Sequence, residues 1–140
     1  MLCIRFSAGL SGIGEKTRHL TEDSSGERNV MAGLTLTFWP NPVYRNHTAE
    51  TRWYFNVVLR EVEARHVHVL RYHGEWYDMV GRCLDHKDER LDIRLTPLQH
   101  IAYPDLWVTS AVPQFRYQLT VIGQDTQGRE VTGEGVLLCQ

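Results

Sequence analysis

Hydrophobic and polar residues alternate with a period of two along much of this chain, and that pattern predicts β-strands. The longest stretch of extended character covers residues 52–72, and it begins with a half-buried strand. One face of this strand is consistently apolar, whereas the other carries mixed and polar residues. The core-facing side chains are predicted to be Trp53, Phe55, Val57 and Leu59.

Other segments alternate in the same way and are separated by prolines, glycines and charged residues. No window of helical length has apolar residues at positions i, i+3, i+4 and i+7. About seven or eight short strands with regularly spaced turns predict an all-β fold, an antiparallel β-sandwich. The further strands are predicted over residues 34–39, 66–73, 75–83, 91–95, 106–112, 115–122 and 130–138.

Several residues are predicted to interrupt the strands. Gly74 is expected to separate one strand from the next, because glycine weakens strand pairing. Residues 84–90 are highly charged and are most simply a solvated loop. Residues 96–105 contain two prolines and are predicted to cross between the sheets. The strand at 34–39 is expected at a sheet edge, since the prolines that end it lack amide donors.

The N-terminal part of the chain has a different character. Residues 1–30 contain few large apolar side chains and no regular period, so they are predicted to form a flexible tail with one short extended piece near residues 3–6. Residues 31–140 are predicted to form a single β-sandwich domain, in keeping with a length of 140 residues. Met31 is a candidate for the true start of translation, and the sequence does not decide this.

The charges of the chain are nearly balanced, with 15 basic and 17 acidic residues and a formal net charge of −2. This balance gives no general attraction to nucleic acid or to anionic lipid. No apolar run approaches the roughly 20 residues that span a bilayer, and the N-terminus lacks the features of a secretory signal. We therefore predict a soluble protein with no nucleic-acid partner and no membrane span, while its compartment stays open.

Three cysteines occur at positions 3, 83 and 139, an odd number with long spacings. Such spacings fit neither a disulfide framework nor a metal knuckle, so buried free thiols are predicted. A disulfide between Cys83 and Cys139 is the alternative, and spacing alone cannot establish the Cα separation that it needs.

The final third of the chain, FRYQLTVIGQDTQGREVTGEGVLL, resembles the last hairpin of immunoglobulin-like and fibronectin type III-like domains. The segment TLTFWPNPV, followed by WYFNVVLRE, is similar to bacterial Ig-like modules, in which a P-x-P turn precedes a tryptophan-led strand. The Cys…Trp…Cys signature of antibody domains is absent. The resemblance implies a sandwich fold and a role in adhesion, spacing or ligand binding. The matching residues of the hairpin are Tyr117, Leu119, Val121, Asp125, Gly128 and Val131.

Three histidines are candidate metal ligands. His66 and His68 lie at positions i and i+2 of a predicted strand, so they point the same way with Cα atoms about 7 Å apart and could share one transition metal such as zinc. His73 is a candidate third ligand if the chain folds back at Gly74. The run HVHVLRYHGE also resembles the H-x-H motif of cupins, although the glycine expected before the first histidine and the second cupin motif are missing. The alternative is a solvated strand face without cofactor.

Two aromatic residues, Tyr72 and Trp76, flank Gly74 and are candidate surface anchors for a ligand. Aromatic side chains on an exposed sheet face can stack on sugars or fill a pocket of a protein partner. The alternative is packing in the core, which aromatic residues dominate in small domains, and it is the favoured interpretation for both residues.

No nucleophile elbow or phosphate-binding glycine loop is present, so catalysis has no support from any motif. The sequence favours a non-catalytic binding or interaction module with a protein or carbohydrate partner. A small metal-binding, cupin-like β-barrel protein is the first alternative. The second is a structural subunit, in which exposed strand edges assemble into a homo-oligomer or complete the sheet of another chain.

Overall fold

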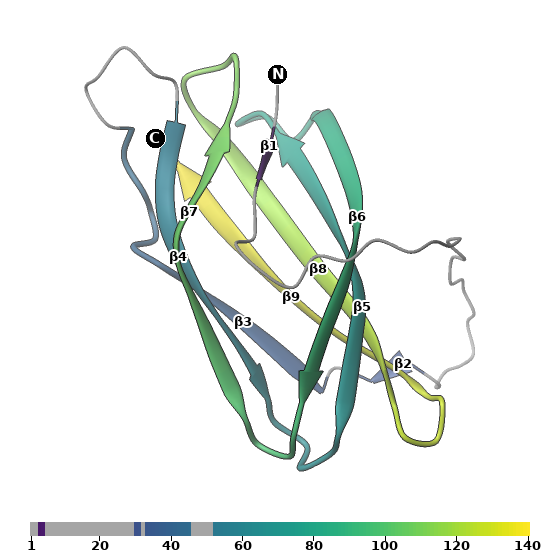
Figure 1. Ribbon diagram of the computed structural model, residues 1–140. Coiled ribbons are helices and arrows are strands. Elements are labelled where there is room, and N and C mark those ends of the chain that lie inside the picture. The colour runs from purple at the N-terminus through teal and green to yellow at the C-terminus, as the bar shows by residue number, and fades with distance from the viewer. Residues whose placement is uncertain (1–2, 5–29, 32, 46–51) are drawn as a thin grey trace.

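The chain folds into two β-sheets that pack face to face. The computed structural model describes residues 3–4, 30–31, 33–45 and 52–140. Figure 1 shows the two layers, and the elements assigned over these ranges are all strands. Neighbouring strands are antiparallel except β2 and β9, which are parallel. The prediction of an antiparallel β-sandwich is confirmed.

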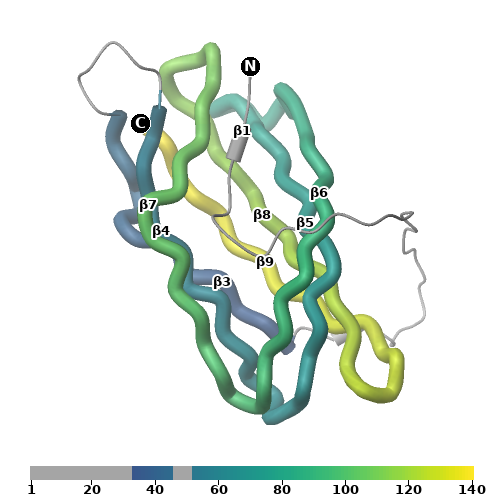
Figure 2. The backbone as a smooth tube through the Cα atoms, in the orientation of Figure 1, coloured from purple at the N-terminus to yellow at the C-terminus, as the bar shows by residue number. Residues whose placement is uncertain are grey.

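The smaller sheet has the strand order β1-β7-β4-β3, and the larger sheet has the order β2-β9-β8-β5-β6. Two hairpins of the larger sheet, β5–β6 and β8–β9, turn at opposite ends of it (Figure 2). The strands of the smaller sheet are β1 (Cys3–Ile4), β3 (Leu34–Trp39), β4 (Arg52–Glu61) and β7 (His100–Thr109). Those of the larger sheet are β2 (Val30–Met31), β5 (Val67–Tyr77), β6 (Cys83–Leu95), β8 (Phe115–Asp125) and β9 (Glu130–Cys139).

The core lies between the two sheets and is built from alternate residues of every long strand. The predicted inward face of β4 is confirmed, since its four apolar side chains are at most 2% exposed. Trp53 of β4 packs edge-on against Phe115 of β8, with ring centroids 4.9 Å apart, and so joins the two layers. Burial of such large aromatic side chains supplies much of the driving force for folding.

Gly74 lies inside β5 and does not break it, contrary to the prediction. A Cβ atom at this position would come within 2.9 Å of Cε1 and Cζ of Tyr117, which packs on the inner side of the strand. Glycine is therefore needed here for the close approach of a ring. The strand continues past it to Trp76, whose ring centroid is 4.7 Å from that of Tyr117.

The charged residues 84–90 form the first half of β6, so the predicted solvated loop is wrong. This strand is at the edge of the larger sheet, and its first half is exposed or half-buried on both faces. A strand that is wet on both faces shows no alternation of apolar and polar residues. The last residues of β6 do alternate, and only that part was predictable.

The predicted crossing at residues 96–105 is mostly strand β7, which begins at His100 and contains Pro104. The register with β4 shifts between Phe55 and Val57, opposite this proline. A bulge of this kind accommodates a residue that has no amide to donate. The freed backbone is held instead by Asn56, whose Oδ1 accepts a hydrogen bond of 3.0 Å from the amide of Asp105.

The predicted tail, residues 1–30, lies outside the described residues except for β1 and Val30. These short segments pair with β7 and β9, respectively. Cys83 and Cys139 are both free, so the alternative of a disulfide between them is wrong. Cys139 is buried as predicted, whereas Cys83 is exposed. In the part of the chain that the structure describes, no helix has the length and apolar character to span a membrane.

Candidate functional site on the outer face of the larger sheet

A β-bulge in β5 decides which of its residues face solvent. The register with both neighbouring strands shifts between Val69 and Arg71. Before the bulge, Val69 points into the core and His68 outward. Before the bulge the odd-numbered positions face the core, and after it the even-numbered positions do, so that Tyr72 points into the core and His73 outward. A period of two counted straight through this point therefore assigns Tyr72 to the wrong face.

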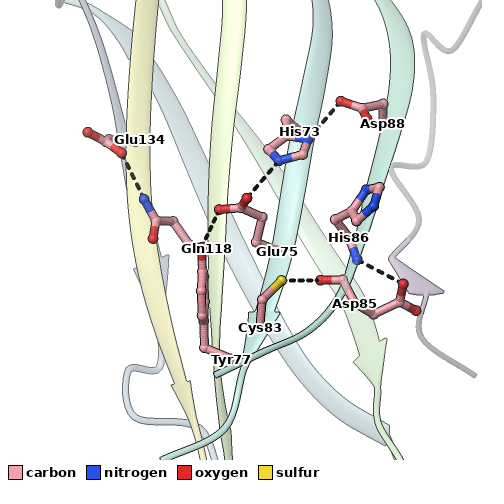
Figure 3. Close-up of polar contacts among 9 residues, drawn as sticks. All are labelled: His73, Glu75, Tyr77, Cys83, Asp85, His86, Asp88, Gln118 and Glu134. Carbon is pink, nitrogen blue, oxygen red and sulfur yellow. Dashed lines mark hydrogen bonds and ion pairs between the residues drawn. The ribbon is translucent and has the colours of Figure 1, made fainter. Parts of the chain in front are cut away.

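His73 is held between two carboxylates on this outer face (Figure 3). Asp88 of β6 is its direct cross-strand neighbour, and the imidazole Nδ1 lies 2.7 Å from Oδ1 of Asp88. Glu75 lies two residues further along β5 on the same face, and the imidazole Nε2 lies 3.0 Å from its Oε2. The hydroxyl group of Tyr77 donates a hydrogen bond of 2.7 Å to the other oxygen of Glu75. Strand alternation thus aligns three polar side chains of β5.

The titration of these groups is coupled. Burial lowers the pKa of His73, but hydrogen bonds and charge from Glu75 and Asp88 outweigh it, so the pKa is raised above its usual value. Burial raises the pKa of Glu75, but hydrogen bonds from Tyr77 and His73 and the nearby imidazole charge leave it lowered. The hydrogen bond to Glu75, with burial, raises the pKa of Tyr77 to about 12. The arrangement therefore favours an imidazolium between two carboxylates.

The rest of this face extends the polar surface. The ring of His86 lies across from Glu75 in register, with its centroid 6.0 Å from that of His73. Further across the sheet, Gln118 of β8 donates a hydrogen bond of 3.0 Å to Glu134 of β9. We call the group on β5 and β6 the outer-face cluster. It consists of His73, Glu75, Tyr77, His86 and Asp88.

The predicted metal ligands do not converge. His66 precedes β5 and is exposed, and Nε2 of His68 lies 2.6 Å from Oδ1 of Asp92. His73 is five residues beyond His68, on the order of 15 Å along a strand. Both ring nitrogens of His73 face carboxylate oxygens, those of Glu75 and Asp88. Over the described ranges, no three or more His, Cys, Asp and Glu side chains are grouped to hold a metal ion. Metal binding by His66 and His68 stays a prediction.

The two candidate aromatic anchors lie in the core. Tyr72 is 1% exposed and Trp76 is 0% exposed, so neither can contact a ligand at the surface of this fold. Their assignment to a surface turn is wrong because β5 continues through Gly74, and the favoured interpretation, packing, agrees with their burial.

The sequence did not single out Glu75, Tyr77 or Asp88 as site residues. One signal was present, because His73, Glu75 and Tyr77 follow each other at i, i+2 and i+4, the spacing of one strand face. The partner from β6 could not be found, because the charged segment gave no strand pattern and hence no register. Pairing of His73 with Asp88 requires the register of the hairpin.

The cluster brings charge and hydrogen-bonding groups together at the sheet surface. In its protonated form His73 donates to a carboxylate oxygen from each ring nitrogen. The side chains of His73 and Glu75 are each 30% exposed, and the hydrogen-bonding capacity that remains is that of the carboxylate oxygens of Glu75 and Asp88. The cluster offers fixed charges and hydrogen-bonding groups on a rigid sheet surface.

Comparisons with known proteins support the fold. The chain is similar to Northeast Structural Genomics Consortium target SoR45, with a TM-score of 0.60 and 9% identity over 76% of this chain and 87% of that one. It is also similar to a Bordetella pertussis protein solved under the name ApaA, with a TM-score of 0.54 and 15% identity over 77% of this chain and 95% of the other. No protein-family profile matches the sequence, and no curated protein matches it either. At these identities the likeness concerns the sandwich fold alone.

Proposed function

We propose that this protein is a non-catalytic binding module of the immunoglobulin-like or fibronectin type III-like class, and that it binds a protein partner through the outer-face cluster. The metal-binding and strand-edge alternatives have less support.

The strand order supports this class of fold. When the seven long strands β3 to β9 are lettered A to G, strands A, B and E form one sheet and strands C, D, F and G form the other. Immunoglobulin constant domains have sheets ABED and CFG, so only the fourth strand differs in its sheet. Fold alone does not define function, so the proposal depends on the surface.

The proposal depends on one observation, which is that each ring nitrogen of His73 contacts a different carboxylate, that of Asp88 or that of Glu75. Ordering one imidazole between Glu75 and Asp88, with Tyr77 fixing Glu75, costs side-chain entropy at a solvated surface. Half-exposed ion pairs of this kind contribute little to stability. A preordered charge array on a flat sheet is well suited to a partner that presents complementary charges.

The free edge of the larger sheet argues against assembly through strand pairing. Among the described strands, β6 pairs only with β5, and its exposed half carries Asp85, Lys87 and Asp88. Charged side chains along an edge strand oppose the addition of another strand. The face of the β5–β6 hairpin is therefore a better candidate surface than its edge.

Photo-cross-linking in the native cells tests the proposal. Arg90 on the outer face of β6 and Arg60 on the outer face of β4 are both exposed, and each is replaced in turn by p-benzoylphenylalanine. We expect one discrete protein adduct from position 90 that is absent at position 60. The same adduct should be lost when Glu75→Gln and Asp88→Asn remove the charges. Equal adducts at both positions, or none at position 90, would contradict the proposal.

A further inference from the structure

Two turns of the larger sheet have the same sequence pattern, Asp-x-x-Gly-Arg. The β5–β6 hairpin turns at Asp78-Met79-Val80-Gly81-Arg82, and the β8–β9 hairpin turns at Asp125-Thr126-Gln127-Gly128-Arg129. In each, the glycine has a positive φ, 95° for Gly81 and 79° for Gly128, which glycine adopts without strain. The two turns therefore place their central residues on equivalent backbone positions.

The aspartate makes the same hydrogen bonds in both turns. Oδ1 of Asp78 accepts from the amides of Val80 and Arg82, at 3.0 and 2.8 Å, and its Oδ2 accepts from Nε of Arg82 at 3.0 Å. Asp125 repeats the pattern with amides two and four residues later, at 2.9 and 3.0 Å, and with the guanidinium of Arg129 at 2.9 Å. The two middle residues contribute only their backbone to this network.

The two tips differ in the side chains that they present. Thr126 and Gln127 are polar and exposed, as expected for a turn in water. Met79 and Val80 are 51% and 82% exposed, and Leu84 nearby is 38% exposed. Since the polar tip forms the same turn, the apolar side chains of Met79 and Val80 are not needed for its geometry. Met79 and Val80 are consecutive and both exposed, so they form one small apolar patch at the tip, and contiguous exposed apolar patches mark interaction sites.

Resting on the proposed function, we infer that Met79 and Val80 are the apolar anchor of the same binding surface, and that they insert into an apolar pocket with a basic rim on a partner protein. The hairpin segment at residues 75–88 supplies the charge argument, because it carries four carboxylates against one arginine and one lysine. The negative net charge of this segment attracts a basic rim on a partner protein, whereas an anionic lipid surface repels it.

The β5–β6 hairpin holds the anchor rigidly. Asp78 and Arg82 close the turn, and the outer-face cluster begins on the same strand with Tyr77. A rigid apolar tip loses little entropy on binding, and the charged face beside it can orient the partner.

The test begins with p-benzoylphenylalanine at Val80 or, as the matched control, at Gln127, in the full chain in its native cells. We expect a protein adduct from position 80, the same protein that position 90 captures, and none from position 127. The cross-linked peptide of that protein should contain apolar residues next to Lys or Arg. An adduct with lipid only, or with a second copy of this chain only, would overturn the inference.

Affinity measurements with the identified, purified partner complete the test. The double variant Met79→Thr/Val80→Gln copies the polar tip, and it should bind at least about tenfold more weakly than the wild type. The reciprocal variant Thr126→Met/Gln127→Val should bind within about twofold of the wild type. Unchanged affinity of the first variant would overturn the inference.

The outer-face variant separates this inference from the proposed function. If Glu75→Gln/Asp88→Asn weakens binding and the tip variant does not, the proposed function stands and the apolar anchor is wrong. If neither variant weakens binding, both are wrong. Vesicles of phosphatidylcholine with phosphatidylserine serve as a second probe, and sedimentation of the wild type with them, lost in the tip variant, would also overturn the inference.

Discussion

The two Asp-x-x-Gly-Arg hairpins share their turn geometry but not their surroundings. The side chain of Asp125 is 2% exposed, and its Oδ2 lies 3.8 Å from the guanidinium of Arg65, which belongs to the β4–β5 connection. The side chain of Asp78 is 16% exposed, and its partner Arg82 is 81% exposed. One turn thus links two connections of the sandwich, whereas the other projects from it.

This difference indicates a structural role for the β8–β9 turn and leaves the β5–β6 turn available for binding. In the β8–β9 turn the aspartate is buried and faces the guanidinium groups of Arg129 and Arg65, so Asp125 is expected to contribute to stability. A projecting turn that uses the same aspartate and glycine is free in its two middle residues. Because local motif and role are separable in this way, the apolar tip at Met79 and Val80 can be tested without disturbing the fold.

The largest expected effect concerns the contact between the two hairpins. Gly74→Val places a branched side chain where Tyr117 of β8 packs against β5. Overpacking of this kind should lower the free energy of unfolding by about 1–3 kcal/mol or more. Urea denaturation measures it, with the outward-facing variant His73→Val as control. Equal stability of the wild type and Gly74→Val would show that the ring does not pack there.

The second prediction compares the two aspartates. Asp125→Asn should lower the melting temperature about twice as much as Asp78→Asn or more, because the amide nitrogen that replaces Oδ2 cannot accept from the Arg129 guanidinium and the buried negative charge is lost. Thermal unfolding at neutral pH measures the difference. Equal shifts would remove the distinction between the two turns.

The contribution of Asp125 to stability should depend on pH in a direction that can be predicted. Burial raises its pKa, but backbone hydrogen bonds from Arg129 and Gln127 and the charge of Arg129 leave it lowered. A carboxyl group with a lowered pKa stabilises the fold above its unfolded pKa, and this stabilisation is lost as the pH falls. The difference in melting temperature between wild type and Asp125→Asn should therefore narrow in acid. A constant difference would contradict this account.

A smaller effect is expected from His73. Its raised pKa means that its contribution to stability is full below the unfolded pKa and is lost as the pH rises through the folded pKa. The amount should be on the order of 1 kcal/mol or less, since the pair is half-exposed. NMR titration of the imidazole should show a lower pKa in Glu75→Gln than in the wild type. An unchanged pKa would show that Glu75 does not contact His73 in solution.

The smallest effect is expected from the tip itself. Met79→Thr/Val80→Gln should change the free energy of unfolding by no more than about 0.5 kcal/mol, because both side chains are exposed. Denaturation of the purified variant measures this. A large loss of stability would mean that Met79 or Val80 packs against the sandwich.

The sequence predicted the elements whose two faces differ in environment. β3, β4, β8 and β9 have a buried face and a wetter one, so their alternation was readable, and all were found near their predicted bounds. The first half of β6 is exposed or half-buried on both faces, so its sequence shows no alternation of apolar and polar residues. The prediction that a strand ends at Gly74 was wrong. In the sequence, a glycine that makes room for the ring of Tyr117 looks the same as a glycine that ends a strand.

The candidate site was only partly predictable for the same reason. The alternation of His73, Glu75 and Tyr77 was visible, but the bulge between Val69 and Arg71 sets which face they occupy, and the register of an unrecognised strand supplies Asp88. Bulges and cross-strand register depend on long-range pairing, which a single strand does not encode.

Hydrogen–deuterium exchange of the full chain, with and without the partner captured at position 90, locates the surface that binds. If the β5–β6 hairpin holds the partner, residues 75–88 gain protection and the exchange of the matched turn at residues 125–129 is unchanged. Added protection at 125–129 or over the smaller sheet, with none at residues 75–88, would contradict the proposed binding surface.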